Sequence, residues 1–282
     1  MRSGLHANQT RDHAKIIDYY RRSGSTCFNT LTFDDPLLEA LRRMGVTIIG
    51  RVYTDRQSLA GTDRSKYIDR VVDHARRHPA VHYWEGYNEE FAGENDIDDY
   101  GRMEIERMVA LETIGAKAAI GCFSCGTPEI TDGGKAWSAF RPALDHAMHH
   151  GHALALHEYA GPYMQYMVKT PDGQNQWNWG TNSFTGISTD SSLYWDPKLW
   201  GYLTLRYRAA YRMFAEWGLG DLPLFITEGG IDDATPRPGP PGKGYKPFDG
   251  TPWSQLPGIG PYDLQRLWYM WHVTYDRFVK GV

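Results

Sequence analysis

Short apolar segments alternate with amphipathic segments along almost the whole chain. The apolar, strand-like segments are residues 4–8, 27–33, 46–53, 81–91, 118–123, 153–159 and 223–227. Segments with apolar residues at helical spacing follow them, at 12–22, 37–44, 64–78, 98–115, 136–150, 199–217 and 262–280. This alternation of short buried strands and amphipathic helices predicts parallel βαβ units.

Seven such repeats in one direction favour a closed (β/α)8 TIM barrel over an open doubly wound sheet. No dinucleotide fingerprint follows the first strand, and the chain has no phosphate loop. No linker interrupts the pattern, so residues 1–282 are expected to form a single domain. The eighth strand is apparently missing or incomplete in this chain, because Gly281 is interpreted as the cap of the last helix.

Composition narrows the possible partners. The 282 residues are 41% hydrophobic and 23% charged, with a net charge of −4, which gives no basic surface for a nucleic acid. No apolar run is long enough to span a bilayer. Residues 1–3 show no signal-peptide pattern, but a processed start would look the same, so the compartment and the oligomeric state stay open.

The three cysteines are too few for a disulfide framework. Cys122 and Cys125 have the spacing of a redox or half-zinc motif, but no second pair accompanies them. They follow an apolar strand, so packing is the preferred interpretation.

Carboxylates stand at the ends of two predicted strands. The fourth strand ends in Asn88, Glu89 and Glu90, and the seventh ends in Thr227-Glu228-Gly229. A lone Glu at a strand end is usually a surface residue or a helix cap. In α/β barrels, however, reactive groups lie at the C-terminal ends of the strands. Two carboxylates presented from two such ends suggest glycoside hydrolysis, which needs an acid and a second carboxylate.

These two endings resemble those of the clan A glycoside hydrolases, whose (β/α)8 barrels carry the acid/base on strand four and the nucleophile on strand seven. The resemblance covers nearly the whole chain in strand order. It implies that Glu89 is the acid/base, that Glu228 is the nucleophile, and that Asn88 binds the sugar 2-hydroxyl. It also implies retention of configuration, with carboxyl groups about 5–5.5 Å apart, and a pKa of Glu89 raised by Glu228.

Strand six adds two more candidates. His157 and Tyr159 share one face by the period of two, and they resemble the His or Tyr that this clan places beside the nucleophile. The clan usually has an Arg near the end of strand two, where this chain offers only Asn29. Arg51, on strand three, needs an anionic partner if it is buried. Either a structural ion pair or a contact to Glu228 would provide one.

Glu90 is a rival acid, because it stands where many members of the clan have Pro. The clan also places a Trp on strand eight, under the sugar, and that strand is not found in this chain.

Aromatic residues make up 13% of the chain, including ten Trp. Many lie in the long loops at 161–197 and 232–261, among Asn, Gln, Gly, Ser and Pro. Since both loops follow strands that end in candidate site residues, they are expected to form sugar-stacking walls. Packing between the loops is the alternative. The candidate stacking residues are Trp177, Trp179, Trp195 and Trp253.

Four histidines gather near the end of the helix at 136–150, namely His146, His149, His150 and His152. They suggest a metal site, but cationic histidines also suit the dipole at a helix C-terminus. The helix-end interpretation is preferred, and no metal is expected.

The leading hypothesis is a retaining glycoside hydrolase that cleaves β-glycosidic bonds of a poly- or oligosaccharide by a two-Glu double displacement. The long aromatic loops favour endo action, and no cofactor is implied. One alternative is a metal-dependent sugar isomerase or lyase barrel with Glu89, His157 and Glu158 as ligands, which requires Glu158 to point inward. Another is a non-catalytic carbohydrate-binding barrel. The sequence does not identify the sugar or the linkage.

Overall fold

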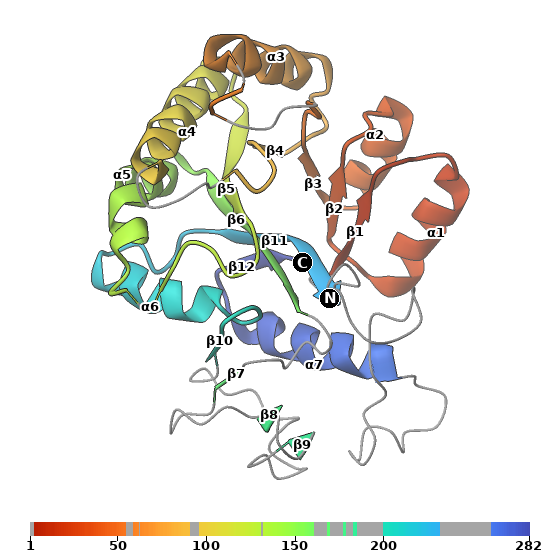
Figure 1. Ribbon diagram of the computed structural model, residues 1–282. Helices are drawn as coiled ribbons and strands as arrows, with labels where there is room; N and C mark the ends of the chain where they lie inside the picture. Colours follow the sequence, from red (N-terminus) through yellow and green to blue (C-terminus); the bar gives the residue numbers. More distant parts are fainter. Residues whose placement is uncertain are drawn as a thin grey trace.

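The computed structural model describes most of the chain. The described residues are 3–54, 59–61, 63–90, 96–130, 132–160, 168–169, 177–178, 183–184, 200–231 and 261–282 (Figure 1). Side chains are not described for residues 160, 168–169, 177–178, 183–184, 231 and 261–265.

Eight parallel strands form one sheet that is nearly closed into a barrel. Their order is that of the chain, with β1 and β12 as the two ends of the sheet. Two further two-stranded sheets pair β10 with β7 and β8 with β9. The barrel strands are β1 (Gly4–Ala7), β2 (Cys27–Thr30), β3 (Thr47–Gly50), β4 (Tyr83–Glu85), β5 (Lys117–Phe123), β6 (Ala153–Ala160), β11 (Leu224–Ile231) and β12 (Val279–Gly281). The small sheets consist of β7 (Val168–Lys169), β8 (Trp177–Asn178), β9 (Ser183–Phe184) and β10 (Trp200–Gly201).

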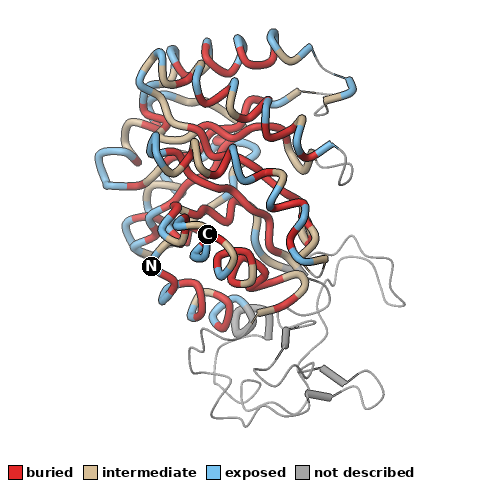
Figure 2. Tube along the Cα trace, turned by 90° about the vertical axis from the view of Figure 1, so that its left-hand side faces the viewer, coloured by how far each residue is buried: buried red, intermediate tan, exposed pale blue. Residues whose placement is uncertain are grey.

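Helices surround the strands, as Figure 1 shows. They are α1 (His13–Ser23), α2 (Asp35–Arg43), α3 (Arg64–Arg77), α4 (Ile97–Glu112), α5 (Lys135–His150), α6 (Tyr207–Glu216) and α7 (Pro261–Tyr275). The strands and the inward sides of the helices are buried (Figure 2). This is the predicted TIM barrel, incomplete at its eighth strand. Among the described residues, no helix has the length and apolar character needed to cross a membrane.

Local signals explain where several helices begin and end. Asp12, Asp34 and Asp63 are N-caps whose carboxylates accept hydrogen bonds from backbone N–H groups in the first turn, at 3.1–3.4 Å. Gly24 and Gly151 end α1 and α5 in the left-handed conformation, which glycine adopts without strain.

The interpretation of Gly281 as a helix cap is wrong. Helix α7 ends at Tyr275, and Gly281 lies in β12, paired with Phe225 of β11. A Cβ at position 281 would come within 2.6 Å of the Cys27 sulfur, so only glycine fits this close approach to β2. The chain therefore contains a short eighth strand, and the incomplete eighth strand is confirmed.

The helix predicted at 199–217 begins later than expected. Trp200–Gly201 forms β10, and Leu205 has φ of 56°, which a helix does not accommodate. Only Tyr207–Glu216 is helical.

The barrel core is apolar near the N-terminal ends of the strands. Cys27, Ile49, Ala153 and Phe225 form one buried cluster against Tyr83. Cys122 packs with Ala119 and Ala155 in a neighbouring cluster, which agrees with the predicted packing role of this residue.

Candidate active site

The chain leaves β4 through a sharp turn that presents Glu89. Glu89 has φ of 56°, a left-handed conformation that costs a non-glycine residue on the order of 1–3 kcal/mol. Its N–H donates to the Cys122 carbonyl at 3.0 Å. Cys122 itself has φ of 45° and lies at an irregularity in the β5–β6 pairing. Two strained residues on adjacent strands therefore support each other and direct the Glu89 side chain over the end of the barrel.

The Glu89 carboxylate accepts two hydrogen bonds from β6. His157 Nδ1 lies 2.8 Å and the Tyr159 hydroxyl 2.6 Å from the same oxygen, Oε1. The alternation of β6 thus places both side chains on one face, as the sequence predicted. The hydrogen bond from His157 lowers the pKa of Glu89 most, Tyr159 adds to it, and burial opposes both.

One expectation about this carboxylate is corrected. Its pKa is lowered, not raised, because donors from His157 and Tyr159 stabilise the charged form. His157 does lie beside Glu228, as expected, but the hydrogen bonds of His157 and Tyr159 go to Glu89. Burial raises the pKa of Tyr159, and its bond to Glu89 adds to the rise, so the phenol remains a donor.

Glu228, within β11, stands beside this group. The β11–β6 register shifts between Ile226 and Glu228, which brings Glu228 opposite His157. Its Oε2 is 3.7 Å from His157 Nδ1, and its Oε1 is 3.2 Å from an Arg51 nitrogen and 3.9 Å from His6 Nδ1. His157 therefore faces both carboxylates.

The two carboxylates are close neighbours. One oxygen of Glu89, one of Glu228 and a ring nitrogen of His157 all lie within 4.8 Å of one another. Both carboxylate side chains are about one-quarter exposed, whereas the His157 side chain is buried. Such a spacing suits transfer of a proton between the groups, and it would also admit a metal ion.

Arg51 fulfils both roles that its sequence position left open. This buried guanidinium pairs with Glu228, hydrogen-bonds the Asn88 side-chain oxygen, and lies 4.0 Å from Glu85. Burial opposes its charge, but the Glu85 and Glu228 carboxylates outweigh burial and raise the pKa of Arg51. Asn29, at the position where the clan has its Arg, donates instead to Glu85 at 3.3 Å.

Glu85 is the residue that sequence reasoning missed. It is fully buried under the two candidate carboxylates and is linked to Asn29 and Arg51. A signal was available, since a Glu within an apolar strand must find a polar partner. Arg51, directly after the preceding strand, likewise needed an anionic partner.

Two other acids lie away from the pair. Glu90 accepts a hydrogen bond from the Leu59 N–H at 2.9 Å, and burial raises its pKa. Glu158 is buried and accepts from the N–H groups of Leu205 and Tyr207 at 2.8 and 2.9 Å. It binds the start of α6 from outside the barrel. The inward-pointing Glu158 required by the isomerase alternative is therefore not observed.

The predicted sugar-stacking residues lie mostly outside the described residues. Trp179, Trp195 and Trp253 are in undescribed segments, and Trp177 is described only by its backbone, in β8. Their role stays a prediction.

No family model and no curated protein matches the chain. Solved structures do match. A beta-1,3-glucanase and allergen of Cryptomeria japonica pollen aligns with a TM-score of 0.50 and 15% identity, over 82% of this chain and 75% of that chain. The fold is a TIM barrel like that one. A variant of Bacteroides uniformis beta-glucuronidase 2 has the same TM-score, with 10% identity over 99% of this chain and 30% of that chain. At these identities the likeness concerns the fold alone.

Proposed function

We propose that this chain is a retaining glycoside hydrolase in which Glu89 and Glu228 form the catalytic pair. The observation that carries the proposal is that one oxygen of Glu89, which follows β4, and one oxygen of Glu228, in β11, lie within 4.8 Å of each other. Retaining enzymes need carboxyl groups about 5–5.5 Å apart, whereas inverting enzymes leave about 6.5–9.5 Å for a water molecule. The similar folds of a glucanase and a glucuronidase agree with this chemistry.

In the proposed reaction, a Glu228 oxygen attacks the anomeric carbon as the glycosidic C–O bond breaks. Glu89 gives its proton to the departing oxygen, and the sugar remains as an ester on Glu228. Glu89 then takes a proton from water, and the resulting hydroxide displaces Glu228. Arg51 stabilises the charge that Glu228 has before attack and regains on release.

The lowered pKa of Glu89 supports a second assignment within the same pair. A carboxylate held ionised by two donors suits a nucleophile, and Glu228 would then supply the proton. We retain Glu228 as the nucleophile because one of its oxygens lies 3.2 Å from the Arg51 guanidinium, and because the clan resemblance assigns it so.

Azide separates these two assignments. In a variant that lacks the nucleophile, azide attacks the substrate directly and gives a sugar azide of inverted configuration. In a variant that lacks the acid/base, azide attacks the covalent intermediate, and the configuration is retained overall. Glu228→Ala is expected to give the inverted azide and Glu89→Ala the retained one. The opposite pair of products would exchange the two roles.

The substrate class is proposed to be a β-linked poly- or oligosaccharide. Probes are an aryl β-glucoside, an aryl β-glucuronide and a soluble β-1,3-glucan, chosen because proteins of similar fold carry those names. Endo action would reduce the viscosity of the glucan before much reducing sugar appears.

The primary test compares wild type, Glu228→Gln and Glu90→Gln on these probes. Activity that is lost in Glu228→Gln and kept in Glu90→Gln supports the proposal. Sugar binding with no turnover in any form would instead identify a non-catalytic carbohydrate-binding barrel. Turnover abolished by EDTA would favour a metal-dependent reaction.

A further inference from the structure

A second cluster of carboxylate and imidazole groups lies at the opposite end of the barrel. Glu112 is the last residue of α4, His146 and His150 are one turn apart on α5, and His152 directly precedes β6. Since helices of this fold run opposite to the strands, their C-termini lie at the N-terminal ends of the strands. The cluster is therefore remote from Glu89 and Glu228.

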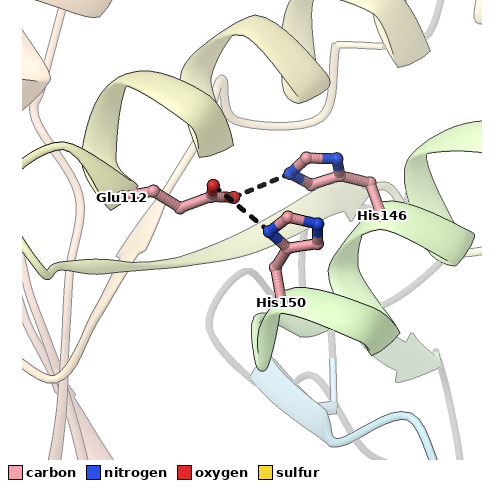
Figure 3. Close-up of side chains that lie close together, drawn as sticks. All are labelled: Glu112, His146 and His150. Atoms are coloured by element: carbon pink, nitrogen blue, oxygen red, sulfur yellow. Dashed lines mark hydrogen bonds and ion pairs between the residues drawn. The ribbon is translucent and has the colours of Figure 1, made fainter.

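Three imidazoles converge on the one carboxylate. His146 Nε2 is 2.7 Å from Glu112 Oε1, and His150 Nδ1 is 3.2 Å from Oε2. Figure 3 shows both rings turning a nitrogen towards the carboxylate. The rings of His146 and His150 are stacked, with centroids 4.0 Å apart and planes 10° apart.

His152 orients the carboxylate from within the protein. It is fully buried, and its Nδ1 accepts a hydrogen bond from the Ala118 N–H at 2.9 Å. The hydrogen of the neutral ring is therefore on Nε2, which donates to Glu112 Oε1 at 2.9 Å. A buried histidine that fixes the direction of a carboxylate is the kind of support that metal ligands receive from their neighbours.

The donor set exceeds what an ion pair requires. Two stacked imidazoles, those of His146 and His150, each turn a nitrogen towards the one carboxylate. These two nitrogens and one Glu112 oxygen form a set found in zinc sites that keep a position for water. Zinc–ligand bonds of about 2.0–2.2 Å separate tetrahedral ligand atoms by about 3.4 Å. His146 Nε2 and Glu112 Oε1, now 2.7 Å apart, would need to separate by about 0.7 Å. The three ligand atoms already lie within 4.8 Å of one another.

We propose that Glu112, His146 and His150 bind a divalent first-row transition-metal ion of the Zn²⁺ type, with His152 as a positioning residue. The nitrogen-rich set disfavours Mg²⁺ and Ca²⁺, which prefer oxygen ligands. The His150 side chain is 46% exposed, which leaves a path for the ion and a place for water. The bound ion would tie the end of α4 to the end of α5, so its effect is on stability and not on the proposed hydrolysis.

The test is a titration of the apo protein with Zn²⁺ alone, followed by calorimetry and by thermal unfolding. His146→Ala and His150→Ala are expected to weaken one binding event by more than about 100-fold, beyond the 10–100-fold usual for groups that only orient a ligand. His149→Ala is the matched control, because His149 lies on the same helix end but bonds the Asp145 carbonyl. The Zn²⁺ affinity of His149→Ala should equal that of the wild type, and Zn²⁺ should raise the Tm of both proteins by the same amount.

The Zn²⁺ titration is repeated with the double variant Glu89→Gln/Glu228→Gln. In this variant, Zn²⁺ binding by the Glu89–His157–Glu228 group no longer contributes to the signal. A second measurement needs no variant in the cluster: Co²⁺ added to wild-type protein should shift the ring NMR signals of His146 and His150 far more than that of His149. Absence of a saturable event, the same affinity in His146→Ala, or equal loss in His149→Ala would overturn the proposal.

Discussion

The two ends of the barrel carry the same chemical groups in opposite proportions. At the C-terminal ends of the strands, two carboxylates share one histidine, and Arg51 forms an ion pair with one of them, Glu228. At the N-terminal ends, one carboxylate receives three histidines. In a TIM barrel the first end is where catalysis occurs, and the second contributes to stability. An excess of carboxylates suits attack and proton transfer at a sugar, whereas an excess of imidazoles suits a metal ion.

The largest expected difference between the two ends concerns turnover. Glu228→Gln should lower kcat by more than about 10⁴-fold, and Glu89→Gln by about 10²–10⁴-fold, which is the usual contribution of a general acid or base. Glu112→Gln should leave kcat within about twofold of wild type. Steady-state kinetics on one aryl glycoside, with circular dichroism to check folding, measures all three. Equal loss in Glu112→Gln would remove the functional distinction between the clusters.

A smaller effect is expected at His157, which faces both carboxylates of the proposed catalytic pair. Because the bond from His157 lowers the pKa of Glu89, His157→Gln should raise that pKa and reduce kcat by about 10²-fold. If Glu89 is the acid, the basic limb of the pH–rate profile moves to higher pH. If it is the nucleophile, the acidic limb moves instead. His6→Gln is the control, since His6 approaches only Glu228, and an unmoved profile in His157→Gln would contradict the assignment.

Tyr159→Phe should have a still smaller effect, about tenfold on kcat, because one of the two donors to Glu89 remains. The limb of the pH–rate profile that moves in His157→Gln should also move in Tyr159→Phe, in the same direction but by less. Tyr53→Phe, at an exposed tyrosine, provides the baseline. A larger loss than in His157→Gln would reverse the order of the two donors.

The last expected effect is on stability, at a buried histidine outside both clusters. Burial, with a smaller contribution from the Arg208 charge, lowers the pKa of His272 from 6.5 to about 3. Between those pH values the unfolded chain binds a proton that the folded chain does not bind, so His272 reduces stability as pH falls from 6.5 towards 3. His272→Gln should therefore lose less stability than the wild type across this window. Denaturant unfolding measures it, and equal pH dependence in both proteins would contradict it.

The comparison also shows what the sequence could predict. The period of the apolar residues was enough for the barrel, and strand ends were enough to bring Glu89, Glu228, His157 and Tyr159 together. The sequence did not show which carboxylate His157 and Tyr159 would bond. That choice depends on the turn at Glu89 and the bulge before Glu228, and neither has a sequence signature.

The convergence of histidines on Glu112 could not be predicted for a similar reason. Three of the four histidines share a partner, Glu112, that lies 34–40 residues away in the sequence. The short eighth strand was hidden because three residues are too few to show a period.

The most direct test of the central claim is the configuration of the first product. Proton NMR during the first minutes of hydrolysis of a β-glycoside distinguishes the β-anomer from the α-anomer before they equilibrate. Carboxylates within 4.8 Å predict that the β-anomer is released first. Initial release of the α-anomer would contradict the close catalytic pair of Glu89 and Glu228.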